Sequence, residues 1–157
     1  MRRAMRLAVV VAGLLGAFAV SGAAFADPPG GQVNGQGQTP LSASLGFNAQ
    51  SDLTGSLEYN ADPQGPDAGF AVHCNDYTSY ALVFSKHGTP KVLVTASNCV
   101  DQDGTQIYMT GSFSDRGEPG VHDSLCVAFS YTFPVDPKTA AVHDMGLISN
   151  GNIQIHA

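Results

Sequence analysis

Strand-length segments separated by turn residues run from residue 41 to the end of the chain, and they constrain its fold more than any other feature. No stretch places apolar residues at helical spacing over three turns, so the pattern argues against helices. About eight such segments predict an all-β domain, either an antiparallel β-sandwich or a small β-barrel of short strands. The expected strands are residues 42–50, 56–60, 70–75, 80–85, 91–98, 106–114, 124–133 and 152–156.

Apolar residues alternate most clearly in the segment 124–133, which predicts a strand with one buried face. Five side chains are expected to share that face: Leu125, Val127, Phe129, Tyr131 and Phe133. Ile153 and Ile155 alternate in the same way in the last strand. We expect the last strand to pair with the first one, near Leu45 and Phe47, because that pairing would remove an exposed edge.

The first 26 residues have the composition of a secretory signal peptide. Arg2, Arg3 and Arg6 precede the apolar run 7–20, and small residues follow up to Ala26. The apolar run is about fourteen residues long, which is shorter than the roughly twenty that a membrane-spanning helix needs. No later segment is long and apolar enough to span a membrane. We therefore expect cleavage near Ala26 and a secreted, extracellular protein.

Residues 27–40 differ in composition from the rest of the chain. They are rich in Gly, Pro and Gln and contain one aliphatic side chain. Such a segment buries too little apolar surface to offset the entropy of ordering, so we predict a disordered leader. A single β domain is expected over residues 41–157, because the remaining length is that of one ordinary domain.

The charge balance favours some partners over others. Three basic residues lie in residues 1–26, so residues 27–157 contain four basic and all thirteen acidic residues, a formal charge of 4 − 13 = −9. The four are Lys86, Lys91, Arg116 and Lys138. A nucleic acid would be repelled by this charge, whereas metal cations or basic partners would be attracted. Moderate acidity is also simply what keeps a secreted protein soluble.

Three cysteines lie in the part of the chain that is expected to reach an oxidising compartment. A hairpin that pairs residues 79–85 with 91–97 would, when its register is extended, bring Cys74 close to Cys99. We therefore predict a Cys74–Cys99 disulfide and a free Cys126, which we expect to be a small buried apolar side chain. A disulfide that includes Cys126 is the alternative, because spacing alone does not decide the pairing.

Acidic turns are the candidate metal sites. Asp115, Glu118 and Asp123 lie within nine residues, and Asp101 and Asp103 flank another turn. Calcium prefers such oxygen ligands, so the first three residues form a hypothetical calcium site, although the spacing is not that of an EF-hand. The alternative is that these acids form turns and a local ion pair. No other cofactor is expected.

No catalytic residues are predicted. The five histidines lack the spacing of a zinc motif, and the chain has no Gly-x-Ser-x-Gly elbow. His122, Asp123 and Ser124 are the nearest approach to a triad, but neighbours in a strand point to opposite faces. Tyr77 and Tyr80 could stack on sugars if they were exposed, yet we expect them in the core.

Four short motifs occur in a recognisable order along the expected domain. They are Gly46-Phe47-Asn48, Val72-His73-Cys74, the turn from Asp115 to Gly120 with Asp123, and the closing stretch from Gly151 to His156. In this order and spacing they resemble the post-COAP domains, small secreted bacterial domains found alone or appended to larger exported proteins. The resemblance covers about residues 43–156. It implies an all-β secreted module without an established activity, and it assigns no catalytic residues.

Together these features predict a secreted, non-enzymatic β domain that acts as an extracellular interaction or adhesion module. Loops on a rigid β scaffold are where such modules carry recognition, so we expect an extracellular or envelope partner to bind there. A small secreted enzyme and an envelope-associated structural protein are the alternatives. An enzyme would be distinguished by a concave pocket with convergent titratable groups.

Overall fold

The computed structural model describes residues 31–117, 120 and 122–156, so the expected signal peptide and Glu118 lie outside the described residues. The described residues form ten strands and no helix, which confirms the all-β prediction. The strands are β1 (Gln32–Gln38), β2 (Ser44–Gln50), β3 (Gly55–Asn60), β4 (Ala71–Asn75), β5 (Ser79–Phe84), β6 (Pro90–Asp101), β7 (Gln106–Ser114), β8 (Ser124–Ser130), β9 (Val142–Leu147) and β10 (Ser149–His156). No helix in this part of the chain is long and apolar enough to cross a membrane.

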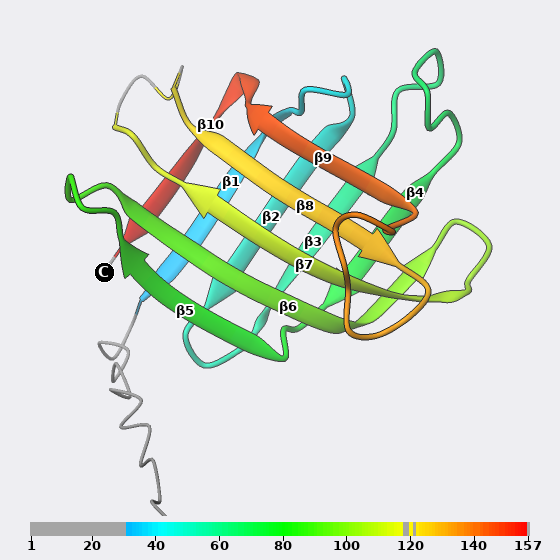
Figure 1. The fold of residues 1–157 in the computed structure, drawn as a ribbon, viewed down its shortest axis with the longest axis horizontal. Coiled ribbons are helices and arrows are strands. Elements are labelled where there is room, and N and C mark those ends of the chain that lie inside the picture. Colours follow the sequence, from blue (N-terminus) through cyan, green and yellow to red (C-terminus); the bar gives the residue numbers. More distant parts are fainter. Residues whose placement is uncertain (1–30, 118–119, 121, 157) are drawn as a thin grey trace, which may run out of the picture.

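All strand pairs are antiparallel, and the sheet is a nearly closed barrel with two crossed layers (Figure 1). The rear layer in this view contains β10 and β1 to β4, and the front layer contains β5 to β9. The strand order is β10-β1-β2-β3-β4-β6-β7-β8-β9, and β5 also pairs with β6. The long strand β6 joins the layers, because Cys99 pairs with β4 while Thr95 pairs with β5. A register shift between Ala96 and Cys99 interrupts the ladder with β7, and such an irregularity bends a strand.

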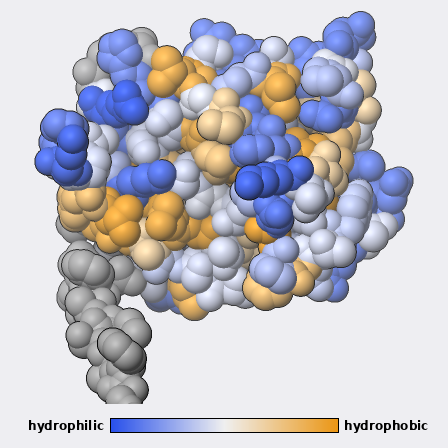
Figure 2. All heavy atoms as spheres, viewed as in Figure 1, coloured by the Kyte–Doolittle hydropathy of each residue, from blue (hydrophilic) through white to orange (hydrophobic). Residues whose placement is uncertain are grey.

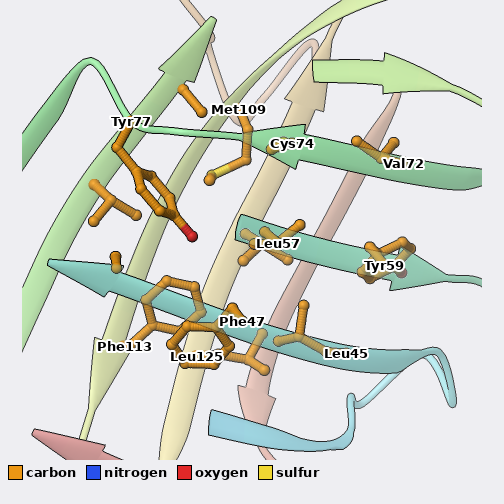
Figure 3. Packing of buried hydrophobic residues seen from close by; sticks show 14 of the residues in the cluster. Leu45, Phe47, Leu57, Tyr59, Val72, Cys74, Tyr77, Met109, Phe113 and Leu125 are labelled. Carbon is orange, nitrogen blue, oxygen red and sulfur yellow. The ribbon is translucent and has the colours of Figure 1, made fainter. Parts of the chain in front are cut away.

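The core fills the space between the two layers (Figure 3). Apolar residues alternate along strands such as β2 and β7, so every second side chain of these strands points inward. The rings of Phe47 and Phe113 stack with centroids 3.9 Å apart, and those of Tyr59 and Phe129 lie 5.1 Å apart. These contacts join β2 to β7 and β3 to β8, and they therefore hold the layers together.

Cys74 and Cys99 form a disulfide, in agreement with the predicted pair. The hairpin β5–β6 has the expected register, with Tyr80 opposite Val94. Cys74 itself lies on β4, which pairs with the part of β6 beyond this hairpin. The disulfide thus links the rear layer to the strand that continues into the front layer.

The predicted disordered leader is wrong for Gln32–Gln38, which forms β1 between β2 and β10. Val33 is fully buried there, and polar residues such as Asn34 and Gln36 occupy the outward positions. At Gly35 a Cβ atom would lie 2.7 Å from the Phe47 ring, so glycine allows the strand to pack closely against the core. Composition alone predicted that the entropy cost of ordering this segment was too large to offset. The hydrogen bonds that β1 makes with strands on both sides offset that cost.

Three other expectations need correction. The last strand pairs with β1 instead of with the segment near Leu45 and Phe47. Strand β8 ends at Ser130, so Tyr131 and Phe133 do not share the buried face and are 48% and 66% exposed. Strand β9 was not expected, because its outward positions include apolar side chains that obscure the alternation.

Candidate anion-binding site

The hairpin between β5 and β6 and the end of β7 meet at one end of the barrel, where they border a pocket of about 480 Å³. Hydrophilic residues cover the tip of this hairpin in Figure 2. Three of the lining side chains are basic or imidazole groups, and the other three carry hydroxyl groups. The six are Ser85, His87, Thr89, Lys91, Ser114 and Arg116.

The hairpin turn holds its part of the pocket in a defined shape. Ser85 Oγ accepts hydrogen bonds from the backbone nitrogens of His87 at 3.2 Å and of Thr89 at 3.1 Å. The nitrogen of Ser85 donates to the carbonyl of Thr89 at 3.0 Å. Gly88 has a φ of 81°, which glycine adopts without steric cost. The turn therefore presents His87 and Thr89 on a fixed backbone.

The two permanent cations come from β6 and from the segment that directly follows its neighbour β7. Lys91, at the start of β6, lies opposite Ser114 at the end of β7. Asp115 continues this ladder by donating from its backbone nitrogen to the carbonyl of Pro90 at 3.3 Å. The backbone nitrogen of Arg116, the next residue, donates to Asp123 Oδ1 at 2.8 Å, which fixes the backbone position of Arg116.

No carboxylate within the described ranges neutralises these cations. The one ion pair there joins His73 to Glu58, on β4 and β3. Lys91 and Arg116 therefore present two positive charges beside three hydroxyl groups, in a chain that is otherwise acidic. An ammonium group, a planar guanidinium and neutral hydroxyl donors together suit an oxyanion such as carboxylate, sulfate or phosphate.

Two carboxylates of the predicted calcium turn, those of Asp115 and Asp123, bind backbone amides. Asp123 is fully buried and accepts from the nitrogens of Arg116 at 2.8 Å and of Ile153 at 2.7 Å. Asp115 accepts from the nitrogens of Gly117 at 2.8 Å and of Ile155 at 3.1 Å. Among the described residues, no three His, Cys, Asp or Glu side chains gather as a metal site. Glu118 lies outside them, and calcium binding at this turn stays a prediction.

The other acidic turn is organised by Asp101. Its carboxylate accepts from the nitrogens of Asp103 at 3.0 Å and of Thr105 at 2.8 Å, and from the hydroxyl of Tyr131 at 2.9 Å. Burial acts to raise the pKa of Asp101, but these hydrogen bonds outweigh burial and lower the pKa below its usual value. Asp101 is thus a turn-forming residue that also holds the segment after β8.

The remaining candidates do not converge on one site. No hydrogen bond joins the side chains of His122, Asp123 and Ser124 within the described structure, so they form no triad there. Tyr77 and Tyr80 are 4% and 7% exposed, which confirms that both belong to the core. Burial raises the pKa of Tyr77 above its usual value.

Cys126 is free, but it is not the fully buried apolar residue that we expected. Its position on β8 points outward, and its thiol is half-buried. Sγ lies 3.4 Å from Nε2 of His143, on the neighbouring strand β9. Cys126 points outward because successive side chains of a strand point to opposite faces, and its neighbours Leu125 and Val127 point inward.

Sequence reasoning missed the cationic pocket because it considered the total charge rather than the distribution of charge. Lys91 and Arg116 are 25 positions apart, and only the pairing of β6 with β7 brings them together. One feature of the sequence could have revealed the pocket: basic residues are few, so the positions of these few matter. Three of the four basic residues in 27–157 lie in or next to two turns, namely Lys86, Lys91 and Arg116. Adjacent strands would place these two turns at the same end of a sheet.

Comparison of the chain with protein-family models, with curated proteins and with solved structures gives no match.

Proposed function

We propose that the protein is a non-enzymatic extracellular binding module that recognises an oxyanion on its ligand through the pocket at the β5–β6 hairpin. The observation that carries this proposal is the convergence of Lys91 and Arg116 on three hydroxyl groups without a carboxylate partner among the described residues. Lys91 would supply a point charge, and Arg116 a planar pair of donors. Hydroxyl donors from Ser85, Thr89 and Ser114 would complete the contacts.

The charge of the rest of the domain limits the size of the anion. Residues 27–157 carry a formal charge of 4 − 13 = −9, so a long polyanion would meet repulsion wherever it left the pocket. A single carboxylate, sulfate or phosphate group avoids that repulsion. The ligand that fits is therefore a molecule with one or a few anionic groups, not a nucleic acid.

The contacts of Ser85 favour binding over nucleophilic catalysis. A nucleophilic serine needs a base that removes its proton. The Oγ atom of Ser85 instead accepts from two backbone nitrogens, and the hydroxyl proton is left to donate to a ligand. An extracellular location is supported by the Cys74–Cys99 disulfide, because such bonds persist in oxidising compartments.

The test is a titration of the purified protein at low ionic strength, followed by ¹H–¹⁵N NMR. Sodium sulfate, sodium phosphate and sodium glucuronate are added separately, and sodium chloride at matched ionic strength is the control. We expect shifts at the backbone amides of His87, Thr89 and Arg116. A dissociation constant of about 1 mM is expected, which corresponds to about 4 kcal/mol. The order of the three affinities then identifies the preferred oxyanion.

Charge-neutralising variants make the test specific. Lys91→Gln and Arg116→Gln should each weaken binding by about tenfold, which corresponds to about 1.4 kcal/mol. Lys138→Gln removes the same charge from an exposed position away from the pocket and should leave the affinity unchanged. The proposal is wrong if none of the three anions shifts these amides, or if Lys138→Gln weakens binding as much as the pocket variants.

A further inference from the structure

A second concave site lies on the outer face of the rear layer, over β1 and its two neighbours β2 and β10. This groove has a volume of about 380 Å³. The lining residues come from all three strands and include no ionisable side chain. They are Asn34, Gly35, Gln36, Phe47, Asn48, Asn152 and Gln154.

Strand register brings the five amide side chains of this groove together. Asn34 lies opposite Asn48 on β2 and opposite Gln154 on β10. Gln36 lies opposite Asn152. Directly opposed residues on one face have Cβ atoms about 5 Å apart, and alternate residues along a strand recur about every 7 Å. The amides thus form a compact two-dimensional array on a sheet that is hydrogen-bonded on both sides of β1.

The amide side chains differ in how many of their hydrogen-bonding groups the protein already uses. Asn48 Oδ1 accepts from the backbone nitrogen of Ser56 at 2.9 Å, which orients its NH₂ group as a donor. The side chains of Asn34 and Gln36 have no hydrogen-bond partner within residues that the structure describes. Each can therefore donate and accept at the same time. Between them lies Gly35, which has no side chain and leaves the floor of the groove open, while the ring of Phe47 packs on the inner side of the sheet.

We infer that this groove binds a neutral oligosaccharide. A sugar presents neighbouring hydroxyl groups that each donate and accept, which matches an array of primary amides. The C–H groups of a sugar ring can lie over Gly35, where no side chain fills the floor of the groove. An anion would find no cation among the lining residues, so the ligand of this groove is chemically distinct from that of the cationic pocket.

A peptide fits the groove less well than a sugar. Extended peptides bind β domains by adding a strand to an open edge. Strand β1 has no open edge, since it pairs with β2 and β10, and the groove lies on the face of the sheet. A peptide on that face would have to satisfy its backbone groups with side-chain amides alone. A sugar needs only the groups that the groove offers.

The experiment titrates the purified protein with three neutral sugars, cellohexaose, laminarihexaose and chitohexaose, and follows the side-chain NH₂ signals by ¹H–¹⁵N NMR. At least one sugar at about 10 mM should shift the NH₂ signals of Asn34, Gln36 and Asn48, while those of Gln64 and Gln102 stay in place. The absence of any shift with all three sugars would overturn the inference. Equal shifts with a neutral Gly-Ser hexapeptide would also overturn it.

Isosteric variants test the donors without removing side-chain volume. Asn34→Asp and Asn48→Asp keep an acceptor oxygen, and in the second variant that oxygen still accepts from Ser56. Each should weaken sugar binding by about tenfold, since a donor is lost and a hydroxyl is left unpaired. Gln50→Glu adds the same charge on β2 outside the lining and should leave the affinity unchanged. An equal loss in Gln50→Glu would contradict the assignment.

The two sites can fail independently. Sugar binding should persist in Arg116→Gln, and sulfate binding should persist in Asn34→Asp. Melting curves of each variant confirm that the fold is retained before its affinity is compared with that of the parent protein. A sugar affinity that fell as much in Arg116→Gln as in Asn34→Asp would place the sugar in the cationic pocket and overturn the inference.

Discussion

The carboxylate of Asp123 accepts a hydrogen bond at 2.7 Å from the backbone nitrogen of Ile153, which lies 30 residues away in the sequence. Asp115 makes the corresponding contact with the nitrogen of Ile155 at 3.1 Å. Strand β10 pairs with β1 on one side, so these two carboxylates satisfy amides on its other side. Unpaired strand edges promote association between sheets, and the carboxylates of Asp115 and Asp123 cover this edge at two of its amides.

Replacing Asp123 should destabilise the fold. Asp123→Ala leaves the nitrogens of Arg116 and Ile153 without their acceptor, and a hydrogen bond to a charged group contributes about 1.5 to 3 kcal/mol. We expect the free energy of unfolding, measured by urea denaturation, to fall by about 3 kcal/mol. Asp103→Ala is the control, because the exposed Asp103 accepts one long bond of 3.3 Å from Gln102. A smaller loss for Asp123→Ala than for this control would refute the edge-covering role.

Asp144 should be the residue that holds β9 against the β1–β2 turn. This carboxylate is fully buried and accepts from the hydroxyls of Thr39 and Tyr59 and from the nitrogen of Leu41. Asp144→Ala leaves three donors unpaired, so we expect a loss of about 4 kcal/mol in the free energy of unfolding. Thr39→Val removes one of these donors and the acceptor of the Ala43 nitrogen, and it should cost about 2 kcal/mol. Similar urea midpoints for the two variants would contradict this assignment.

The stability should fall at alkaline pH because Tyr77 is buried. Its pKa in the folded state is raised above the unfolded value of about 10, so the folded state retains a proton that the unfolded state loses. The stabilisation is fully present below pH 10. It is lost as the pH rises towards the folded pKa, at up to about 1.4 kcal/mol per pH unit.

Tyr77→Phe separates this effect from the hydrogen bond of the hydroxyl group. At pH 8 the variant should be about 1 kcal/mol less stable, since the 3.0 Å bond to the carbonyl of Ser56 is lost. Above pH 10 the difference should shrink, because the variant has no proton to lose at this position. Urea denaturation at pH 8, 10 and 11 measures the difference in the free energy of unfolding between the parent protein and Tyr77→Phe. A difference that stays constant with pH would show that ionisation of Tyr77 is not linked to folding.

Iodoacetamide should modify one cysteine in the native protein. Cys126 points outward and is half-buried, whereas Cys74 and Cys99 form a disulfide and are 0% and 1% exposed. Mass spectrometry should find one added group on Cys126 without denaturant, and three after reduction in urea. Labelling of Cys74 or Cys99 in the native, unreduced protein would contradict the disulfide.

Alternation of apolar residues along the chain was enough to determine the fold class and most of the strands. Strand β7 spans Gln106–Ser114, the predicted range, because every second residue from Ile107 to Phe113 is inward. The β5–β6 register also followed from local pattern, since a short turn determines which residues face each other. The Cys74–Cys99 pair was predicted by extending this register, although Cys74 reaches Cys99 through the separate strand β4. These are properties of neighbouring segments.

Tertiary structure alone decided which distant segments meet. Side-chain period tells which face of a strand is buried, but it does not identify the strand's neighbour. That is why β1 was missed: its one buried apolar side chain, Val33, becomes meaningful only between β2 and β10. For the same reason the sequence did not reveal that the acidic residues bind backbone amides. The role of Asp123 depends on the position of Ile153, which is distant in the sequence. Both candidate binding sites likewise arise from pairing between strands, and no single segment contains either of them.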